Sequence, residues 1–400
     1  MEEKKGFFKG MLLTFIAFVL AFVLFVKVGN YHIVVYHATT GNTDSKAVTV
    51  SDIDFSSVVS KIRSLNKIIE DTYLFDYDTN EVVEDLYKGY IAGLNDKYTS
   101  YYTKEEYNDL MSDSSGTYKG IGVSISKEED GRILIKEVFA DSPAKKAGIE
   151  VDDELKAVND KEISKFETTT DIVKEIKGND KAKLKVYRAS TDKTLEVEVE
   201  LADVDQNTVN YKMLDSKVGY LQITKFEDVT TEQFENAMKA LDKKGMESLV
   251  LDLRDNPGGT LSSVVNVADY LLPKGKILSI EDKNGNKKEY KSDASAFGKP
   301  MAVLINGNSA SASEVLAGAI KDYKAGTLIG TTSFGKGIVQ NIYSLSDGSG
   351  LKLTTAKYYT PAGNYIHGKG IEPDIKIEQS KDTKNDNVLN KAIETLTKED

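Results

Sequence analysis

Residues 248–272, SLVLDLRDNPGGTLSSVVNVADYLL, decide the fold, because a strand, a tight turn and a helix follow one another there. The run SLVLDL at 248–253 is typical of a strand that is buried on both faces. The run LSSVVNVADYLL at 261–272 has its apolar residues at helical spacing. The turn Pro257-Gly258-Gly259 separates the two runs. A strand that passes directly into a helix is typical of an α/β fold.

The same alternation continues on both sides of this stretch. The dipeptide Asn284-Gly285 lies between two further runs and predicts a hairpin. Alternating strands and helices over residues 206–378 predict an α/β core with helices packed on a largely parallel sheet. The other predicted strands are 218–223, 301–305, 327–330, 337–343 and 351–359, and the other predicted helices are 231–244 and 311–323.

The rest of the chain divides into segments of different character. Residues 51–112 carry apolar residues at helical spacing, so a small helical region is expected. Residues 113–205 hold short alternating runs and glycine turns, which indicate a mainly-β domain. Residues 379–400 form a polar tail in which 388–396 could add one helix. Residues 27–50 are expected to be a linker.

Residues 10–26 form an uncharged apolar stretch that comes close to spanning a membrane. Lysines in the leader 1–9 predict that this leader is cytoplasmic and that the remainder lies outside. A cleaved signal peptide is the alternative, with Val19-Leu20-Ala21 as its cleavage site. The apolar FVLFV that follows extends the stretch beyond a usual signal peptide, so a single uncleaved transmembrane helix is favoured.

The composition excludes several classes of function. The 400 residues are enough for two or three globular units, and their formal net charge of −11 argues against nucleic-acid binding. The chain has no cysteine, which excludes a thiol nucleophile, a disulfide and a thiolate metal site. It also has no HExxH motif and no cluster of histidine and aspartate. We therefore expect neither a metal nor a cofactor.

The turn in LRDNPGG at 253–259 is the first candidate for chemistry. Its glycines leave backbone N–H groups unshielded, and such groups suit an oxyanion. A tight turn that needs glycine for a positive φ explains the same residues without any chemistry.

The segment NSASASE at 308–314 is the second candidate. Ser311 is expected at the start of a helix, where backbone N–H groups point outward and the helix dipole favours negative charge. A nucleophile there has an oxyanion site at the next amide, that of Ala312. The alternative is structural, because Ser311 and Glu314 also fit an S-x-x-E capping box.

The segment TSFGKGIVQ at 332–340 is the third candidate. Lys336 lies between two glycines at the entry to a strand, and regular alternation along that strand would let Gln340 hold its amine. GTTSFGKG at 330–337 also fits the G-x-x-x-x-G-K of a phosphate-binding loop. Gly337, however, replaces the Ser or Thr that would bind magnesium, and a strand follows instead of a helix, so nucleotide binding is not expected.

Few residues can serve as a base for Ser311. The three histidines are His32 and His37, just beyond the apolar N-terminal stretch, and His367 in a turn-rich segment. A Ser-His-Asp triad is therefore poorly supported. A neutral lysine can serve instead, and lowering its pKa from ~10.4 to ~7.5 needs roughly 4 kcal/mol, which burial can supply. Ser–Lys acyl transfer fits the available residues.

In this order, LRDNPGG, NSASASE and FGKGIVQ resemble the motifs of the C-terminal processing peptidases, also called carboxyl-terminal or tail-specific proteases. The likeness includes GLNDKYTSYYT at 93–103 and GKGIEPD at 368–374. It implies a protease core of the ClpP/crotonase-like α/β type. The implied roles are Ser311 as nucleophile, Lys336 as general base, Gln340 as its positioning partner, and the N–H groups of Ala312 and Gly258, in preference to Gly259, as the oxyanion hole.

The region before this core resembles a PDZ domain inserted between the helical region and the core. YKGIGVSI at 118–125 looks like a carboxylate-binding loop, and SPAKKAGIEVDDELKAVND at 142–160 resembles the helix-turn-strand signature of bacterial PDZ domains. PDZ domains add an extended peptide to a sheet edge and capture its terminal carboxylate with backbone amides. The residues implied for this capture are Gly120, Ile121, Gly122 and Val123.

Together, the apolar N-terminal stretch and the resemblance imply a membrane-anchored serine endopeptidase that cleaves near the C-termini of extracytoplasmic proteins, at a bacterial cell surface. The expected partners are protein or peptide substrates with free C-termini and the membrane, with no nucleic acid and with a homodimer left open. Two other interpretations remain. One is a membrane-tethered PDZ binding protein with an inactive α/β domain. The other is a crotonase-like acyl-transfer enzyme, which accounts for neither the PDZ domain nor the anchor.

Overall fold

The computed structural model of the chain describes residues 53–293, 296–381 and 385–398. The leader 1–9, the expected membrane helix 10–26 and the linker 27–50 lie outside the described residues. Within the described part, no helix combines the length and the apolar character that crossing a membrane requires. The chain divides into two units, one that ends at Asp76 and one that begins at Tyr77.

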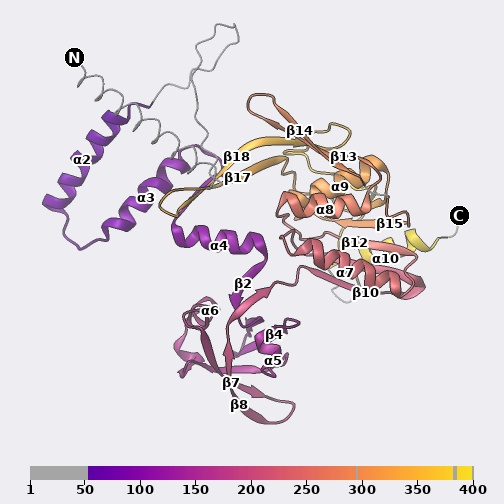
Figure 1. Cartoon of the computed structure of the whole chain (residues 1–400), viewed down its shortest axis with the longest axis horizontal. Helices are drawn as coiled ribbons and strands as arrows, with labels where there is room; N and C mark the ends of the chain where they lie inside the picture. Colours follow the sequence, from indigo (N-terminus) through magenta and orange to yellow (C-terminus); the bar gives the residue numbers. More distant parts are fainter. Residues whose placement is uncertain (1–52, 294–295, 382–384, 399–400) are drawn as a thin grey trace, which may run out of the picture. The chain divides into compact units, whose positions relative to one another are not determined.

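The described part of the first unit contains helix α2 (Phe55–Thr72), drawn in indigo in Figure 1. Asp54 caps this helix by accepting hydrogen bonds from the N–H groups of Ser56 and Ser57. A helix is what the apolar spacing of this segment predicts. None of its side chains is buried by the residues that the structure describes.

The second unit begins with α3 (Thr79–Ala92), strand β1 (Ser100–Tyr102) and α4 (Lys104–Ser115). A capping box opens α4, because Glu106 accepts from the Thr103 N–H and the Thr103 hydroxyl accepts from the Glu106 N–H. The helix ends at Gly116, whose φ of 74° is left-handed. The helical region therefore runs slightly past the predicted boundary at 112.

A mainly-β domain follows, where the sequence places one at 113–205. Strands β2 and β9 pair antiparallel where the chain enters and leaves this domain. The main sheet has the order β3-β4-β5-β7-β8 with β6 paired to β5, so β3 is an edge strand. The strands are β2 (Thr117–Gly120), β3 (Val123–Lys127), β4 (Ile133–Val138), β5 (Glu154–Val158), β6 (Lys161–Glu162), β7 (Lys181–Arg188), β8 (Lys193–Glu200) and β9 (Ala202–Asp205), and the helices are α5 (Pro143–Lys146) and α6 (Thr169–Lys177).

The predicted α/β core is built on a six-stranded sheet with the order β10-β11-β12-β15-β16-β19. Neighbouring strands from β11 to β19 run parallel, and β10 pairs antiparallel with β11. Parallel neighbours agree with the alternation of strands and helices in the sequence. The strands are β10 (Val209–Met213), β11 (Val218–Ile223), β12 (Ser248–Asp252), β15 (Met301–Ile305), β16 (Thr327–Gly330) and β19 (Ile375–Lys376).

Helices cover both faces of this sheet. Leu249 and Leu251 of β12 pack in one core with α7, α8 and α9, whereas Val250 between them packs with Val388 and Ala392 of α10. Because successive side chains of a strand point to opposite faces, a strand covered on both faces is apolar throughout. The segment predicted as a polar tail therefore contains a helix of the core. The helices are α7 (Thr230–Lys243), α8 (Leu261–Leu271), α9 (Ala312–Tyr323) and α10 (Asn387–Thr397).

A second sheet is antiparallel and has the order β1-β18-β13-β14, with β17 also paired to β18. The sequence predicts strands β13, β14, β17 and β18 but not that they form a sheet of their own, and strand β1 lies in the segment predicted to be helical. Tight turns such as the one at Gly285, with φ 82°, make sequence neighbours pair antiparallel instead of joining the parallel sheet. The strands are β13 (Gly275–Asp282), β14 (Lys287–Ser292), β17 (Ile338–Ser344) and β18 (Gly350–Tyr359).

Candidate active site

Ser311 lies between β15 and α9, directly before the first residue of the helix. Its backbone has φ 53° and ψ −109°, outside the regions that L-residues prefer. Such strain persists only where the surroundings hold it, and strained residues cluster at functional sites. The turn also follows the carboxyl end of a parallel strand, where ligands bind in α/β sheets. The fold thus presents Ser311 at the position expected of a reactive group.

The carboxylate of Glu314 holds this turn in place. It is fully buried, and it accepts a hydrogen bond from the Ser311 N–H at 2.9 Å, so the capping interaction of Glu314 is present. The same carboxylate accepts from the N–H of Lys336 at 2.8 Å, from the N–H of Gly335 at 2.6 Å and from the hydroxyl of Ser333 at 2.5 Å. One buried group therefore ties the Ser311 turn to the Lys336 loop.

The turn Pro257-Gly258-Gly259 packs against Ser311. Gly258 has φ 102°, and a Cβ added there would lie 2.8 Å from the Ser311 Cβ and 2.9 Å from the Ala312 nitrogen. A Cβ on Gly259 would overlap the carbonyl oxygen of Phe226 at 1.9 Å. Both positions thus require glycine for steric reasons, whatever their chemical role.

The backbone N–H groups around this turn differ in availability. The Gly258 N–H donates to Oδ1 of the buried Asn256 at 2.8 Å. The Gly259 N–H finds no acceptor within the described residues. The Ala312 N–H belongs to the first turn of α9, where a helix leaves its N–H groups without internal partners. An oxyanion held at Gly258 would have to share that N–H with Asn256.

Lys336 is half-buried in the loop before β17. Burial lowers its pKa most, the charge of Lys352 lowers it further, and Glu314 and Asp96 act in the opposite direction. The net shift of the pKa is downward, which is the direction that a general base requires. The Nζ atom lies 4.7 Å from the centroid of the Tyr98 ring.

The structure changes the argument for Gln340. Strand β17 begins at Ile338, beyond Lys336, and a register shift between Val339 and Gln340 interrupts regular alternation. Strand periodicity therefore does not connect Gln340 to Lys336. The Nε2 of Gln340 donates to Oγ1 of Thr354 at 3.3 Å.

One cleft of about 620 Å³ nevertheless gathers the predicted catalytic groups. Ser311, Ala312, Gly258, Lys336 and Gln340 all line it. Three chain segments that are far apart in the sequence supply these five residues. Within the described residues, no three His, Asp or Glu side chains are grouped so that they could hold a metal ion.

The predicted carboxylate-binding loop connects two strands, because Gly120 ends β2 and Val123 begins β3. Gly122 has φ 77°, a left-handed value that favours glycine. Ile121 is buried, and its carbonyl accepts the Ala144 N–H at 2.8 Å. The loop is thus fixed beside the edge strand β3, where an extended peptide can add to the sheet.

Residues 217–377 match the model of Peptidase family S41, and residues 120–199 match that of the PDZ domain. The chain is 35% identical over 340 residues to the carboxy-terminal processing protease CtpB of Bacillus subtilis, with 83% of this chain and 70% of that protein covered. This chain belongs to the carboxy-terminal processing proteases of family S41. The protease is also 36% identical over 326 residues to CtpA of the same bacterium, which covers 80% of this chain and 69% of that one.

A solved structure of a putative S41 protease from Bacteroides fragilis has the same fold at 17% identity, with a TM-score of 0.51 over 82% of this chain and 92% of that one. The predicted family, the PDZ domain and the serine-protease activity are thus confirmed. Neither an inactive PDZ binding protein nor a crotonase-like acyl-transfer enzyme is supported.

Sequence reasoning missed several residues that shape the active site of this protease. Asn256 fixes the glycine turn, since its Nδ2 donates to the Ile223 carbonyl at 2.8 Å. The hydroxyl of the buried Tyr358 donates to the Ser311 carbonyl at 3.2 Å. The S-x-x-E spacing signals Glu314 only as a cap, and no spacing connects Tyr358 to Ser311.

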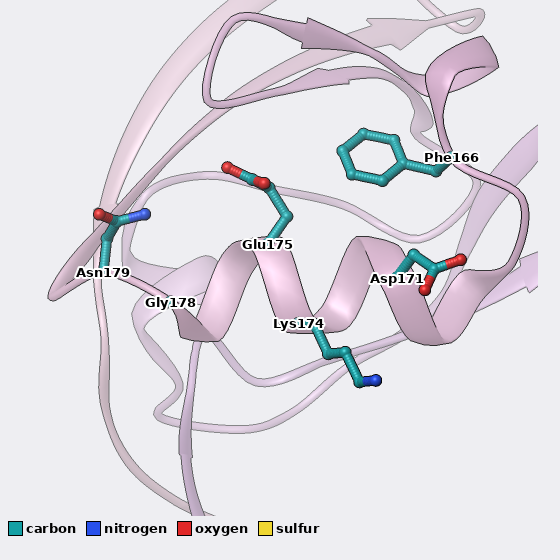
Figure 2. Close-up of a pocket in the computed structure, with 6 residues that line it drawn as sticks. All are labelled: Phe166, Asp171, Lys174, Glu175, Gly178 and Asn179. Carbon is teal, nitrogen blue, oxygen red and sulfur yellow. The ribbon is translucent and has the colours of Figure 1, made fainter. Parts of the chain in front are cut away.

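The protease has another hollow, of about 490 Å³, along α6 of its PDZ domain (Figure 2). The side chain of Lys174 points away from those of Glu175 and Phe166, so these groups do not converge on one ligand. Glu175 is already paired with the Lys161 ammonium at 2.6 Å. This hollow contains none of the residues predicted for catalysis or for carboxylate capture.

Proposed function

We propose that this protease cleaves near the C-termini of extracytoplasmic proteins with Ser311 as nucleophile and Lys336 as general base. The observation that carries the proposal is the shared cleft, in which a strained serine at a helix start lies with a lysine of lowered pKa. The buried Glu314 carboxylate bonds the backbone of both residues and thereby fixes their loops relative to each other.

The proposed reaction has two steps. Neutral Lys336 takes the proton of Ser311 Oγ as that oxygen attacks the peptide carbonyl, and the resulting ammonium gives the proton to the leaving amine as the C–N bond breaks. Water, deprotonated by neutral Lys336, then attacks the ester carbonyl, and the ammonium returns the proton to Ser311 Oγ as the ester C–O bond breaks. The Ala312 N–H and a glycine N–H of the Pro257-Gly258-Gly259 turn stabilise the oxyanion. Gln340 lines the same cleft, and its amide oxygen, whose Nε2 neighbour donates to Thr354, is the group proposed to steady the Lys336 amine.

The PDZ domain is proposed to bind the substrate's C-terminus. The connection from Gly120 to Val123 would capture the terminal carboxylate, and the exposed edge of β3 would pair with the preceding residues. We further propose that residues 10–26 anchor the protease in the membrane with its catalytic part outside the cytoplasm, because lysines precede this apolar stretch.

The test compares segment 28–400 with its Ser311→Ala and Lys336→Arg variants on an unstructured protein, with cuts mapped by mass spectrometry. Both variants should be inactive, since alanine has no nucleophile and a guanidinium stays protonated. Ser313→Ala is the matched control, because Ser313 does not line the cleft and its hydroxyl donates to the Asn256 carbonyl at 3.0 Å. This variant should therefore retain more activity than Ser311→Ala. Full activity of Lys336→Arg, or of Ser311→Ala, would show that the dyad is wrong.

A further inference from the structure

The loop at 95–99, outside the residues that match the two families, contacts the proposed general base through Tyr98. Strand β1 pairs antiparallel with β18, and the loop before it is braced by Asp96, which accepts from the Tyr98 N–H at 3.0 Å and from the Thr99 hydroxyl at 2.7 Å. The Thr99 hydroxyl in turn accepts the Thr354 N–H at 3.1 Å. The position of Tyr98 is therefore fixed relative to β18, the strand that also carries Lys352 and Tyr358 into the cleft.

The ring of Tyr98 is the partner that the structure gives to the Lys336 amine. The Nζ atom lies 4.7 Å from the ring centroid, within the roughly 6 Å at which a cation is attracted to an aromatic face. Lys336 forms no ion pair with any described residue. The Lys97 ammonium also lies near this ring, at 4.9 Å from the centroid.

An aromatic face attracts the ammonium form of lysine much more than the neutral amine, because the attraction is electrostatic. At Lys336 the ring therefore opposes burial, which disfavours the ammonium. Other charges act on the same amine. The positive groups that disfavour its charge are Lys352 and Lys97, the negative groups that favour it are Glu314 and Asp96, and the imidazole of His367 lies beside the same loop through its hydrogen bond with the Gly337 N–H.

We propose that Tyr98 is a positioning residue for the general base: its ring holds the Lys336 amine while it is charged and releases it toward Ser311 when it is neutral. The proposal rests on the Ser–Lys mechanism above. It assigns a role in catalysis to the N-terminal helical region, whose loop at 95–99 would otherwise be a simple connection. Tyr98 itself does not line the cleft, so it acts through Lys336 and not on the substrate.

The test is the pH dependence of kcat/KM for a short peptide, measured with wild-type, Tyr98→Leu and Tyr98→Phe enzymes. Activity rises with pH as Lys336 loses its proton. Without the ring the Lys336 ammonium is less stable. The midpoint of the rise of kcat/KM with pH should therefore move to lower pH by about 0.4 to 1.5 units in Tyr98→Leu. Phenylalanine keeps the ring face, and its midpoint should stay close to that of the wild type.

Tyr290→Leu is the matched control, because the Lys288 Nζ lies at the same 4.7 Å from the Tyr290 centroid, and neither residue lines the cleft. Its midpoint should not move. If Tyr98 had only a structural role, Tyr98→Leu would lower the plateau of kcat/KM without moving the midpoint of the pH profile. If Tyr98→Leu unfolds, Tyr98→Met replaces it, and the same downward shift is expected.

The pKa of Lys336 can also be measured without activity, by acetic anhydride labelling across pH in the Ser311→Ala background with quantification by mass spectrometry. An unmoved midpoint in Tyr98→Leu, or an equal shift in Tyr98→Phe, would overturn the role of the ring. Activity of Lys336→Arg would instead overturn the dyad itself. The two failures are therefore distinguishable.

Discussion

Replacing Glu314 by glutamine tests whether one carboxylate holds the active site together. Oε1 accepts from the Ser333 hydroxyl and the Gly335 N–H, and Oε2 accepts from the N–H groups of Ser311 and Lys336. Glutamine has one acceptor oxygen and one NH2 group. If its oxygen serves Ser333 and Gly335, its NH2 group faces two N–H donors and leaves both without an acceptor.

The expected loss of stability follows from that count. A buried donor without a partner costs about 1 to 3 kcal/mol, so two of them cost about 2 to 6 kcal/mol of the free energy of unfolding. A domain has only about 5 to 15 kcal/mol in total. The Glu314 charge also raises the pKa of Lys336, so its loss should move the alkaline-rising limb of kcat/KM to lower pH. Peptidase activity should fall at every pH, because the strained Ser311 backbone loses its anchor.

Urea unfolding of Glu314→Gln, monitored by far-UV circular dichroism, measures the stability change. Glu106→Gln is the matched control, since Glu106 has the same capping-box position on α4 but is exposed. The free energy of unfolding should fall by no more than about 1 kcal/mol in Glu106→Gln. If Glu314→Gln unfolds at the same urea concentration as this control and keeps wild-type activity, the carboxylate does not hold the two loops.

Three further predictions concern the same cleft and the PDZ domain. Lys352→Met removes a positive charge that lowers the pKa of Lys336, so the midpoint of the pH profile should move to higher pH, opposite to the shift for Tyr98→Leu. Gly258→Ala should reduce kcat by at least about 100-fold, because its Cβ would press on the Ala312 nitrogen, whereas Gly245→Ala, at a similarly left-handed φ but in open space, should keep activity. Amidating a substrate's C-terminus should raise KM, and equal KM values for amidated and free peptides would contradict carboxylate capture by Gly120 to Val123.

The sequence predicts best where a residue's neighbours along the chain decide its structure. The strand at 248–253, the glycine turn after it and the hairpin at Asn284-Gly285 depend on local spacing, and the structure has all three. The helix at 388–396 can be predicted from the sequence for the same reason. Its packing on Val250 and Ala302 cannot be predicted from local spacing. That packing depends on which face of the sheet remains open after α7, α8 and α9 have covered the other face.

The active site shows the same division. Ser311 and Lys336 stand out because each lies in a motif, but the contacts that prepare them come from distant segments. Spacing alone identifies Glu314 only as a cap, and its bonds to Gly335 and Lys336 form only when α9 and the loop before β17 come together. Gln340 shows the converse: β17 begins beyond Lys336 and its register shifts before Gln340, so alternation does not support the pairing, and the resemblance alone does.

Burial alone does not set the pKa of the proposed base, and a comparison of the two lysines in the cleft shows what else acts on it. Lys336 and Lys352 are both half-buried, and burial lowers the pKa of each. Lys336 differs because its backbone is bonded to a carboxylate and its amine lies on an aromatic ring. Both lysines line the cleft that holds Ser311, so the fixed backbone and the aromatic contact of its amine are what set Lys336 apart as the proposed base.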